Sequence, residues 1–173
     1  MKRMITALAL LAALVVSAGL HPSAAGANTR GQLTMAEMIT ENSTYIPEAT
    51  LLNSGCGSAC DFKDPATFRV YYNTCTGCYY HCVDDADDKR TIMDAVASII
   101  LRYSERCRTA WAKTTYSNVS YIKAESRYLN GTHRATVTEY VGNYTVMMDD
   151  ADLQARACVQ PSGPYSLTCT GWY

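Results

Sequence analysis

The stretch Cys75-Thr-Gly-Cys78-Tyr-Tyr-His-Cys82 holds the residues whose types and spacing are best suited to chemistry. Thiolates together with the imidazole of His81 are ligands that zinc prefers. A C-x-x-C pair is also the pattern of a redox dithiol. A third interpretation is that these three cysteines are ends of a disulfide framework. The compartment in which the protein works decides between the three.

The N-terminus predicts export. Lys2 and Arg3 precede an apolar run from Ile5 to Leu20, and Ala25-Gly26-Ala27 supplies the small residues of a cleavage site. This is the pattern of a secretory signal peptide, which we place at residues 1–27. The apolar run is short for a membrane span. We therefore expect residues 28–173 to form a single secreted, extracellular, disulfide-rich domain without a membrane anchor.

All eight cysteines lie in the mature part of the chain. An even number in an oxidising compartment predicts four disulfides, with no metal site and no cofactor. The predicted disulfide cysteines are Cys56, Cys60, Cys75, Cys78, Cys82, Cys107, Cys158 and Cys169.

Spacing favours one pairing and leaves others open. Cys158–Cys169 closes a short loop and is the pairing that we favour, so Cys107 must then pair within the cysteines of 56–82. Two C-x3-C segments could also face each other, with bonds 56–82 and 60–78.

Charge and sequence triplets indicate the kind of partner. Without Lys2 and Arg3, 13 basic residues stand against 16 acidic ones, which gives a net charge of about −3 and argues against nucleic acid as the main partner. Four N-x-[ST] triplets predict surface glycans in a eukaryotic secretory pathway. Their asparagines are Asn42, Asn118, Asn130 and Asn143.

Residues 88–113 predict one long helix. Apolar residues recur at three- and four-residue steps between Ile92 and Trp111, with polar residues on the other side. The acidic run Asp84–Asp88 suits the positive end of the helix dipole. The same run lacks the ligand spacing and central glycine of a calcium loop. Residues 28–55, ahead of the first cysteines, are expected to form a lead-in helix or a loosely ordered arm.

A hairpin follows the predicted helix. Asn130-Gly131 favours a two-residue turn between strands at 119–129 and 132–141. Closing this turn places Ile122 opposite Glu139 and Ala124 opposite Val137. We expect further strands at 144–148 and 165–169, joined by a polar connection or helical turn. The predicted fold class is α+β: one long helix packed on an antiparallel meander, stapled by disulfides.

A helix followed by a hairpin resembles the cystatin-type protease inhibitors, whose first hairpin loop is Gln-x-Val-x-Gly. The corresponding loop here is Arg127-Tyr-Leu-Asn-Gly131, in which the glycine and an aliphatic residue match. The resemblance covers about 50 residues and is topological. It implies protease inhibition as one version of a binding function.

Catalytic motifs are poorly represented. The mature chain has two histidines, His81 and His133, and no G-x-S-x-G or phosphate-binding glycine loop. A small secreted hydrolase, such as a nuclease that uses these histidines, is the alternative to a non-catalytic protein. A structural matrix or coat protein is a further alternative.

The tyrosines are the most suggestive functional feature. The chain has 13 tyrosines and two phenylalanines, and tyrosine is enriched at protein recognition surfaces. Tyr121 and Tyr140 fall opposite each other on the outward face of the predicted hairpin, where cross-strand pairing could also simply stabilise the sheet. We therefore predict a secreted, non-catalytic glycoprotein that binds an extracellular protein partner as an effector, inhibitor or receptor ligand.

Overall fold

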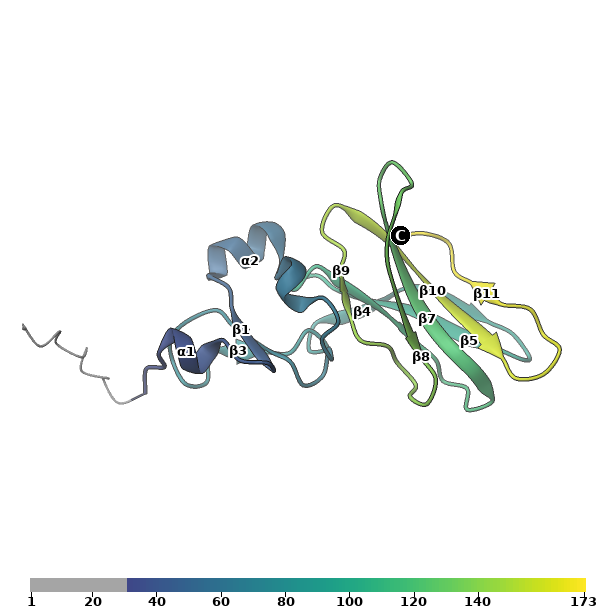
Figure 1. The fold of residues 1–173 in the computed structure, drawn as a ribbon, viewed down its shortest axis with the longest axis horizontal. Helices are drawn as coiled ribbons and strands as arrows, with labels where there is room; N and C mark the ends of the chain where they lie inside the picture. Colours follow the sequence, from purple (N-terminus) through teal and green to yellow (C-terminus); the bar gives the residue numbers. More distant parts are fainter. Residues whose placement is uncertain (1–30) are drawn as a thin grey trace, which may run out of the picture.

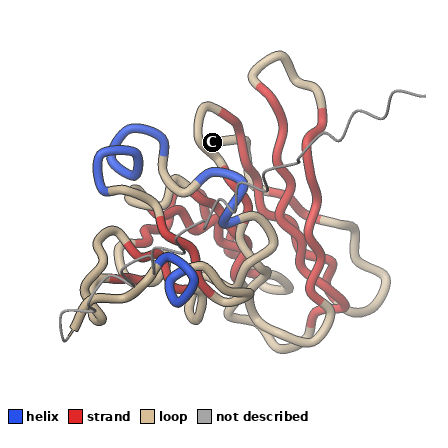
Figure 2. Tube along the Cα trace, turned by 60° about the vertical axis from the view of Figure 1, so that its left-hand side comes forward, coloured by secondary structure: helices blue, strands red, loops and turns tan. Residues whose placement is uncertain are grey.

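Two four-stranded antiparallel sheets packed face to face form a β-sandwich in the computed structural model, which describes residues 31–173 (Figure 1). A smaller unit, formed by residues 31–82 and carrying the helices, lies at one end of this sandwich (Figure 2). The predicted signal peptide, residues 1–27, lies outside the described residues.

The outer sheet is built around the predicted hairpin and has the strand order β11-β10-β7-β8. Its strands are β7 (Val119–Tyr128), β8 (His133–Glu139), β10 (Leu153–Pro161) and β11 (Thr168–Cys169). Ile122 pairs with Glu139 and Ala124 with Val137, as the turn sequence predicts. At the tip the register shifts by one residue between Ser126 and Arg127, so the connection is longer than a two-residue turn.

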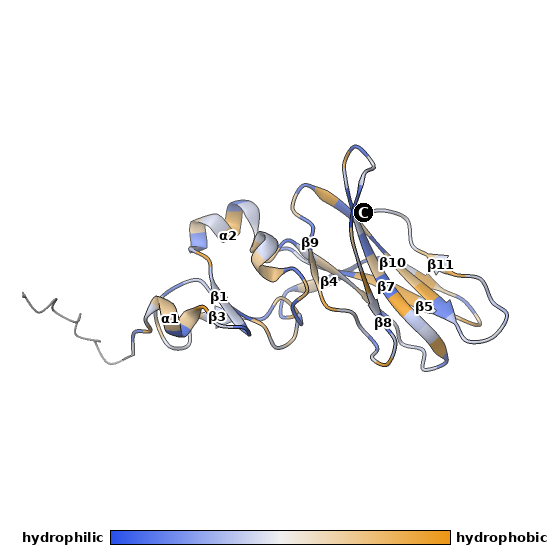
Figure 3. Ribbon diagram, in the orientation of Figure 1, coloured by the Kyte–Doolittle hydropathy of each residue, from blue (hydrophilic) through white to orange (hydrophobic). Residues whose placement is uncertain are grey.

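The central sheet has the order β4-β5-β6-β9. Its strands are β4 (Ala86–Met93), β5 (Ser98–Ser104), β6 (Thr109–Lys113) and β9 (Met148–Asp149). The main hydrophobic core lies between the two sheets, because alternate residues of each strand point inward. Figure 3 shows hydrophobic and hydrophilic positions mixed along β5, β7 and β10. The core includes Ile99, Leu101, Ala110, Ile122, Ala124, Ala155, Ala157 and Val159.

The N-terminal unit packs at the end of the sandwich against Trp111, which points away from the main core. It contains α1 (Met35–Met38), β1 (Ser43–Tyr45), α2 (Glu48–Ser54), the 3-10 helix η1 (Gly57–Cys60), β2 (Arg69–Tyr71) and β3 (Tyr79–Tyr80). A second buried cluster joins it to the sheet through Trp111 of β6, which contacts side chains such as Phe68 and Val70. The described part of residues 28–55 is therefore neither a single lead-in helix nor an arm without elements.

All eight cysteines are paired. The bonds are Cys56–Cys60, Cys75–Cys78, Cys82–Cys107 and Cys158–Cys169. The last is the pairing favoured from loop length, and Cys107 pairs within 56–82. The twin arrangement 56–82 and 60–78 is wrong, because Cys56 pairs with Cys60 within its own segment, while Cys78 pairs with Cys75 and Cys82 with Cys107.

The predicted long helix at 88–113, and with it the α+β class, is wrong. The chain there forms β4, β5 and β6, and α2 with seven residues is the longest helix among residues 31–173. Asp94 ends β4 in a turn, because its side chain accepts hydrogen bonds from the amides of Val96 and Ala97. A second turn at residues 105–108 joins β5 to β6, and Arg108 adopts a positive φ there.

Burial explains why the pattern looked helical. β5 is covered on both faces, with Ile99 and Leu101 in the sandwich core and Ile100 on the face toward the N-terminal unit. A strand buried on both faces carries apolar residues at consecutive positions. Such a run also contains apolar residues three and four positions apart, which is the pattern of an amphipathic helix. The acidic run caps no helix. Instead, Asp85 accepts hydrogen bonds from the Ser104 hydroxyl and the Arg106 amide.

Two later elements also differ from expectation. Residues 149–157, expected as a polar connection, contribute most of β10, which pairs with β7 along its length. The expected strand at 144–148 is reduced to β9. Because no long helix covers the hairpin, the resemblance to cystatin-type inhibitors does not extend to the fold.

Candidate functional site

The outward face of the outer sheet carries Tyr121, which the sequence predicts to bind a partner. Odd-numbered residues of β7 lie on it, because Ile122 and Ala124 are fully buried on the opposite face. Across β10 the paired positions are Gln160, Cys158, Arg156 and Gln154. We call this surface the outer face.

Tyr121 and Tyr140 lie together at one end of the outer face, as predicted. Their ring centroids are 5.7 Å apart with a tilted geometry, within the range of attractive aromatic pairs. Tyr140 is 70% exposed, and Val141, the next residue, is 97% exposed. These side chains extend into solvent beyond the last pair of β8, where core packing does not require them.

Loops at this end add further apolar side chains. Tyr165 lies beside Val96 and Tyr116 in a shallow depression. Gln160, which pairs with Tyr121, donates a hydrogen bond from Nε2 to the Tyr165 carbonyl over 2.6 Å. The depression and the tyrosine pair are therefore adjacent. We call the set Val96, Tyr116, Tyr121, Tyr140, Val141 and Tyr165 the loop-end surface.

A charged network occupies the middle of the outer face. Glu125 accepts hydrogen bonds from Lys123 at 2.5 Å and from Nε of Arg156 at 2.6 Å. Burial by itself would raise the pKa of the Glu125 carboxyl, but these two cations lower it below its usual value. Glu125 is thus an ionised, fully paired carboxylate. It holds its neighbours in place and is not free to act as a base.

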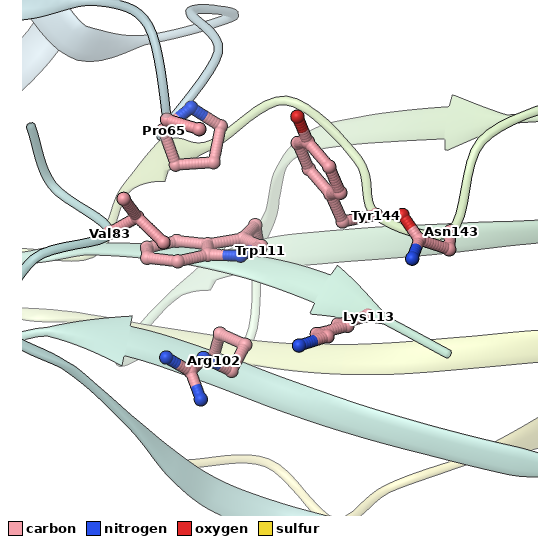
Figure 4. Close-up of a pocket in the computed structure, with 8 residues that line it drawn as sticks. Pro65, Val83, Arg102, Trp111, Lys113, Asn143 and Tyr144 are labelled. Atoms are coloured by element: carbon pink, nitrogen blue, oxygen red, sulfur yellow. The ribbon is translucent and has the colours of Figure 1, made fainter. Parts of the chain in front are cut away.

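A pocket of about 180 Å³ lies where the N-terminal unit meets the central sheet (Figure 4). Trp111 forms its wall, with Val83 and Pro65 on one side and Tyr144 on the other. The Tyr144 hydroxyl donates to Oδ2 of Asp64 over 3.3 Å. Burial and the nearby Asp64 carboxylate raise the pKa of Tyr144, which keeps its hydroxyl protonated.

Two cations also line this pocket, Arg102 and Lys113. Arg102 is held by Asp88 at 2.7 Å and by the Ala86 carbonyl at 2.6 Å. Lys113 has no ion-pair partner among the described residues. An aromatic wall with nearby donors fits a small ligand that has a ring or an apolar part and an acceptor group.

The four asparagines of the N-x-[ST] triplets are all exposed in the structure. Asn130 lies at the β7–β8 tip and Asn42 in the N-terminal unit. Asn118 lines the depression of the loop-end surface, and Asn143 lines the Trp111 pocket. A glycan on either of the last two would stand at the edge of a candidate binding site, and glycosylation itself stays a prediction.

The two histidines lie in different parts of the fold. His81 follows β3 and its ring packs against Tyr79 with centroids 5.5 Å apart. His133 begins β8, and its Nε2 lies 2.9 Å from the Thr136 hydroxyl. The contacts of these side chains do not connect them, so nothing in their surroundings assembles the acid–base pair of the hydrolase alternative.

The cluster Cys75, Cys78 and Cys82, which first suggested a metal or redox site, is divided between two disulfides. Cys75 and Cys78 close a turn before β3, not at the start of a helix where a thiolate is stabilised. The sulfur atoms of Cys56, Cys60 and Cys82 lie within 4.8 Å of one another and are all buried. Because each is in a disulfide, none is available as a thiolate ligand.

Sequence reasoning missed the Trp111 pocket and a second polar pocket around Trp172. Trp172 contacts Arg127 and Arg156, and the pairing of β10 with β7 creates this arrangement. Gln154, Arg156 and Cys158 alternate with small apolar residues, and this pattern could have indicated the strand β10 from the sequence.

The family model described as "Protein of unknown function (DUF2690)" matches residues 58–158. The match runs from η1 to the middle of β10 and so covers most of both sheets. No curated protein and no solved structure matches the chain significantly. None of the helices in residues 31–173 is long and apolar enough to cross a membrane.

Proposed function

The chain belongs to this family of proteins of unknown function, and we propose that it is a secreted, non-catalytic protein that binds an extracellular protein partner. The binding site is the loop-end surface, with Tyr121 and Tyr140 as its central contacts. Its β-sandwich acts as a rigid, disulfide-stabilised support, and its role is that of an effector, an inhibitor or a receptor ligand.

One observation carries the proposal: in the Tyr121–Tyr140 pair, Tyr121 is half-buried and Tyr140 is exposed where packing does not require it. Tyr140 keeps 70% of its surface in solvent although its ring contacts that of Tyr121. A tyrosine with a fixed ring offers a large contact area at a low entropy cost. The adjacent Val141 and Tyr165 extend the apolar area, as in protein interfaces that have a hydrophobic centre and a polar rim.

The surrounding structure supports this role. The loop-end surface lies where β7 begins, away from the N-terminal unit (Figure 1). A partner can therefore approach it without contacting that unit. Residues from four separate connections and from strand β7 meet there. Loops held by a rigid scaffold are the usual location of binding residues.

The proposal is tested by affinity capture from the native extracellular fluid with the full chain, its four disulfides formed. Native protein is compared with the double variant Tyr121→Ser/Tyr140→Ser by quantitative mass spectrometry of the captured proteins. Loss of two central aromatic contacts should weaken capture by roughly thirtyfold or more, as for interface hot spots. The free energy of unfolding should fall by only about 1 kcal/mol, the typical value of an aromatic pair.

Tyr128→Ser is the matched control, because Tyr128 is 48% exposed at the opposite end of β7. It should capture the same partner as native protein. Equal capture by the double variant would contradict the proposal. So would a large loss of stability in that variant, because the tyrosine pair would then serve the sheet and not a partner.

A further inference from the structure

A second site on the outer face is formed by two arginines stacked on the same indole. The guanidinium carbon of Arg127 lies 4.0 Å from the ring centre of Trp172, and that of Arg156 lies 4.5 Å from it. Cation–π contact at these distances fixes the plane of each guanidinium group. Two like charges are therefore both held within 4.5 Å of the centre of one aromatic ring.

Hydrogen bonds fix both arginines in the same way. Nε of Arg127 donates to Oε1 of Gln154 over 2.9 Å, and Nε of Arg156 donates to Oε2 of Glu125 over 2.6 Å. Each bond uses the inner nitrogen of the side chain. The terminal nitrogens of both arginines have no hydrogen-bond partner among residues 31–173, so two oriented pairs of donors remain free.

These donors lie beside a pocket of about 260 Å³ that Gly131 and His133 also line. Glu125 lines it as well, but its carboxylate is neutralised by Lys123 and Arg156. The four charged side chains Lys123, Glu125, Arg127 and Arg156 together carry a net charge of +2. This contrasts with the acidic balance of the mature chain, so the positive charge is a local feature of this pocket.

We propose that this pocket binds a tetrahedral oxyanion group, a phosphate or sulfate, between Arg127 and Arg156. A doubly charged tetrahedral group matches two guanidinium groups in charge and in number of acceptors. The pocket is larger than such an ion, which leaves room for the organic part of an ester. The site is independent of the tyrosine pair, because Arg127 lies six residues along β7 from Tyr121, a separation of about 20 Å.

The test is calorimetric titration of the full, disulfide-bonded chain at low ionic strength. The probes are inorganic phosphate, inorganic sulfate, phenyl phosphate and, as a planar monovalent comparison, acetate. We expect one equivalent of phosphate or sulfate to bind more tightly than acetate. Equal affinity for phosphate and phenyl phosphate identifies a site for the free ion, and tighter binding of phenyl phosphate identifies a site for an ester. Both results support the oxyanion site.

Arg127→Ala should weaken phosphate binding roughly tenfold to a hundredfold, because charge-assisted hydrogen bonds are lost. Arg127→Lys keeps the charge without the paired donors and should also weaken it, which covers the case in which the alanine variant folds poorly. Arg69→Ala is the matched control, because Arg69 is an exposed arginine stacked on Tyr79 in the N-terminal unit. Absence of phosphate and sulfate binding, acetate binding as tight as phosphate binding, or unchanged affinity in folded Arg127 variants would each overturn the proposal.

Discussion

Gly55 lies directly against the carbonyl group of Cys107, and the next residue, Cys56, donates its amide hydrogen to that carbonyl oxygen over 2.9 Å. A Cβ atom on Gly55 would overlap the Cys107 oxygen and lie 2.6 Å from Cβ of Arg108. The φ of Gly55 is +66°. The end of α2 thus rests on the β5–β6 turn at a point where only glycine fits.

Gly55→Ala should therefore destabilise the protein by about 2 to 4 kcal/mol, because it combines an unfavourable φ with a backbone clash. Urea unfolding followed by circular dichroism measures the change. Gly77→Ala is the control, because a Cβ there meets no atom within 4 Å, and it should stay within about 0.5 kcal/mol of native protein. Equal effects of the two substitutions would show that contact with Cys107 is not what constrains Gly55.

The same turn is anchored by the Cys82–Cys107 disulfide, whose cysteines are fully buried. Replacing both by alanine should cost about 3 to 4 kcal/mol, the value expected for a loop of 25 residues in the chain-entropy model.

Cys75 and Cys78, in contrast, are partly exposed and close a very short loop. We expect mild reductant to open Cys75–Cys78 first, as measured by alkylation and mass spectrometry. Earlier reduction of Cys82–Cys107 would contradict this order.

Local turn chemistry explains which parts of the fold were predictable. Asn130-Gly131 specifies a hairpin from neighbouring residues, and the register it implies for Ile122–Glu139 is present. The close pairing of Cys158 with Cys169 follows from their short separation in the same way. Tyr121 and Tyr140 were brought together correctly because their contact depends on that register and on nothing more distant.

The fold class was not predictable by the same reasoning, because it depends on which faces become buried. Trp111 lies in the cluster that joins the N-terminal unit to the central sheet, and the buried Ile100 lies on the same face, while Ile99 and Ala110 lie in the sandwich core. Only the final arrangement shows that residues on both faces of β5 and β6 are buried. Without that knowledge, a doubly buried strand resembles a helix.

The pocket around Trp172 was hidden for a related reason. Arg156 comes beside Glu125 through the pairing of β10 with β7 across about thirty residues of chain. Trp172 reaches the arginines because the C-terminal segment follows β10, where Tyr173 and Ala155 exchange backbone hydrogen bonds. Pairings between distant segments are not encoded by local spacing.

A buried ion pair joins the N-terminal unit to the sandwich. Asp61 accepts hydrogen bonds from both terminal nitrogens of Arg134, and its Oδ1 also accepts the amide of Asp149 over 2.8 Å. Asp61→Ala should cost about 3 to 5 kcal/mol, because the mostly buried Arg134 would lose its main partner. Thermal and urea unfolding measure this loss. Asp152→Ala removes the exposed partner of Arg108 and should change stability by less than about 1 kcal/mol. Similar losses for the two variants would argue against a special role of Asp61.

Asp150 gives the stability of the protein a dependence on pH. Its side chain is 6% exposed, and Oδ1 has no hydrogen-bond partner among the described residues. Burial, followed by repulsion from Asp149, raises the pKa of the Asp150 carboxyl from 3.8 to about 7, although Arg134 and Arg108 oppose the shift. The folded state therefore favours the protonated acid. The stability that the protonated Asp150 contributes is fully present below pH 4 and is lost as the pH rises through 7.

Asp150→Asn removes this ionisation while keeping the shape of the side chain. At pH 8 we expect the variant to be more stable than native protein by up to about 4 kcal/mol, since the pKa rises from 3.8 to about 7 and one pKa unit corresponds to about 1.4 kcal/mol. Near pH 4 the two proteins should differ little. Burial also raises the pKa of Asp149. The stability of the variant should therefore still fall as the pH rises, but less steeply than that of native protein. Urea unfolding between pH 4 and pH 8 measures both curves, with Asp152→Asn as an exposed control. Parallel curves for native protein and Asp150→Asn would mean that Asp150 does not titrate in this range.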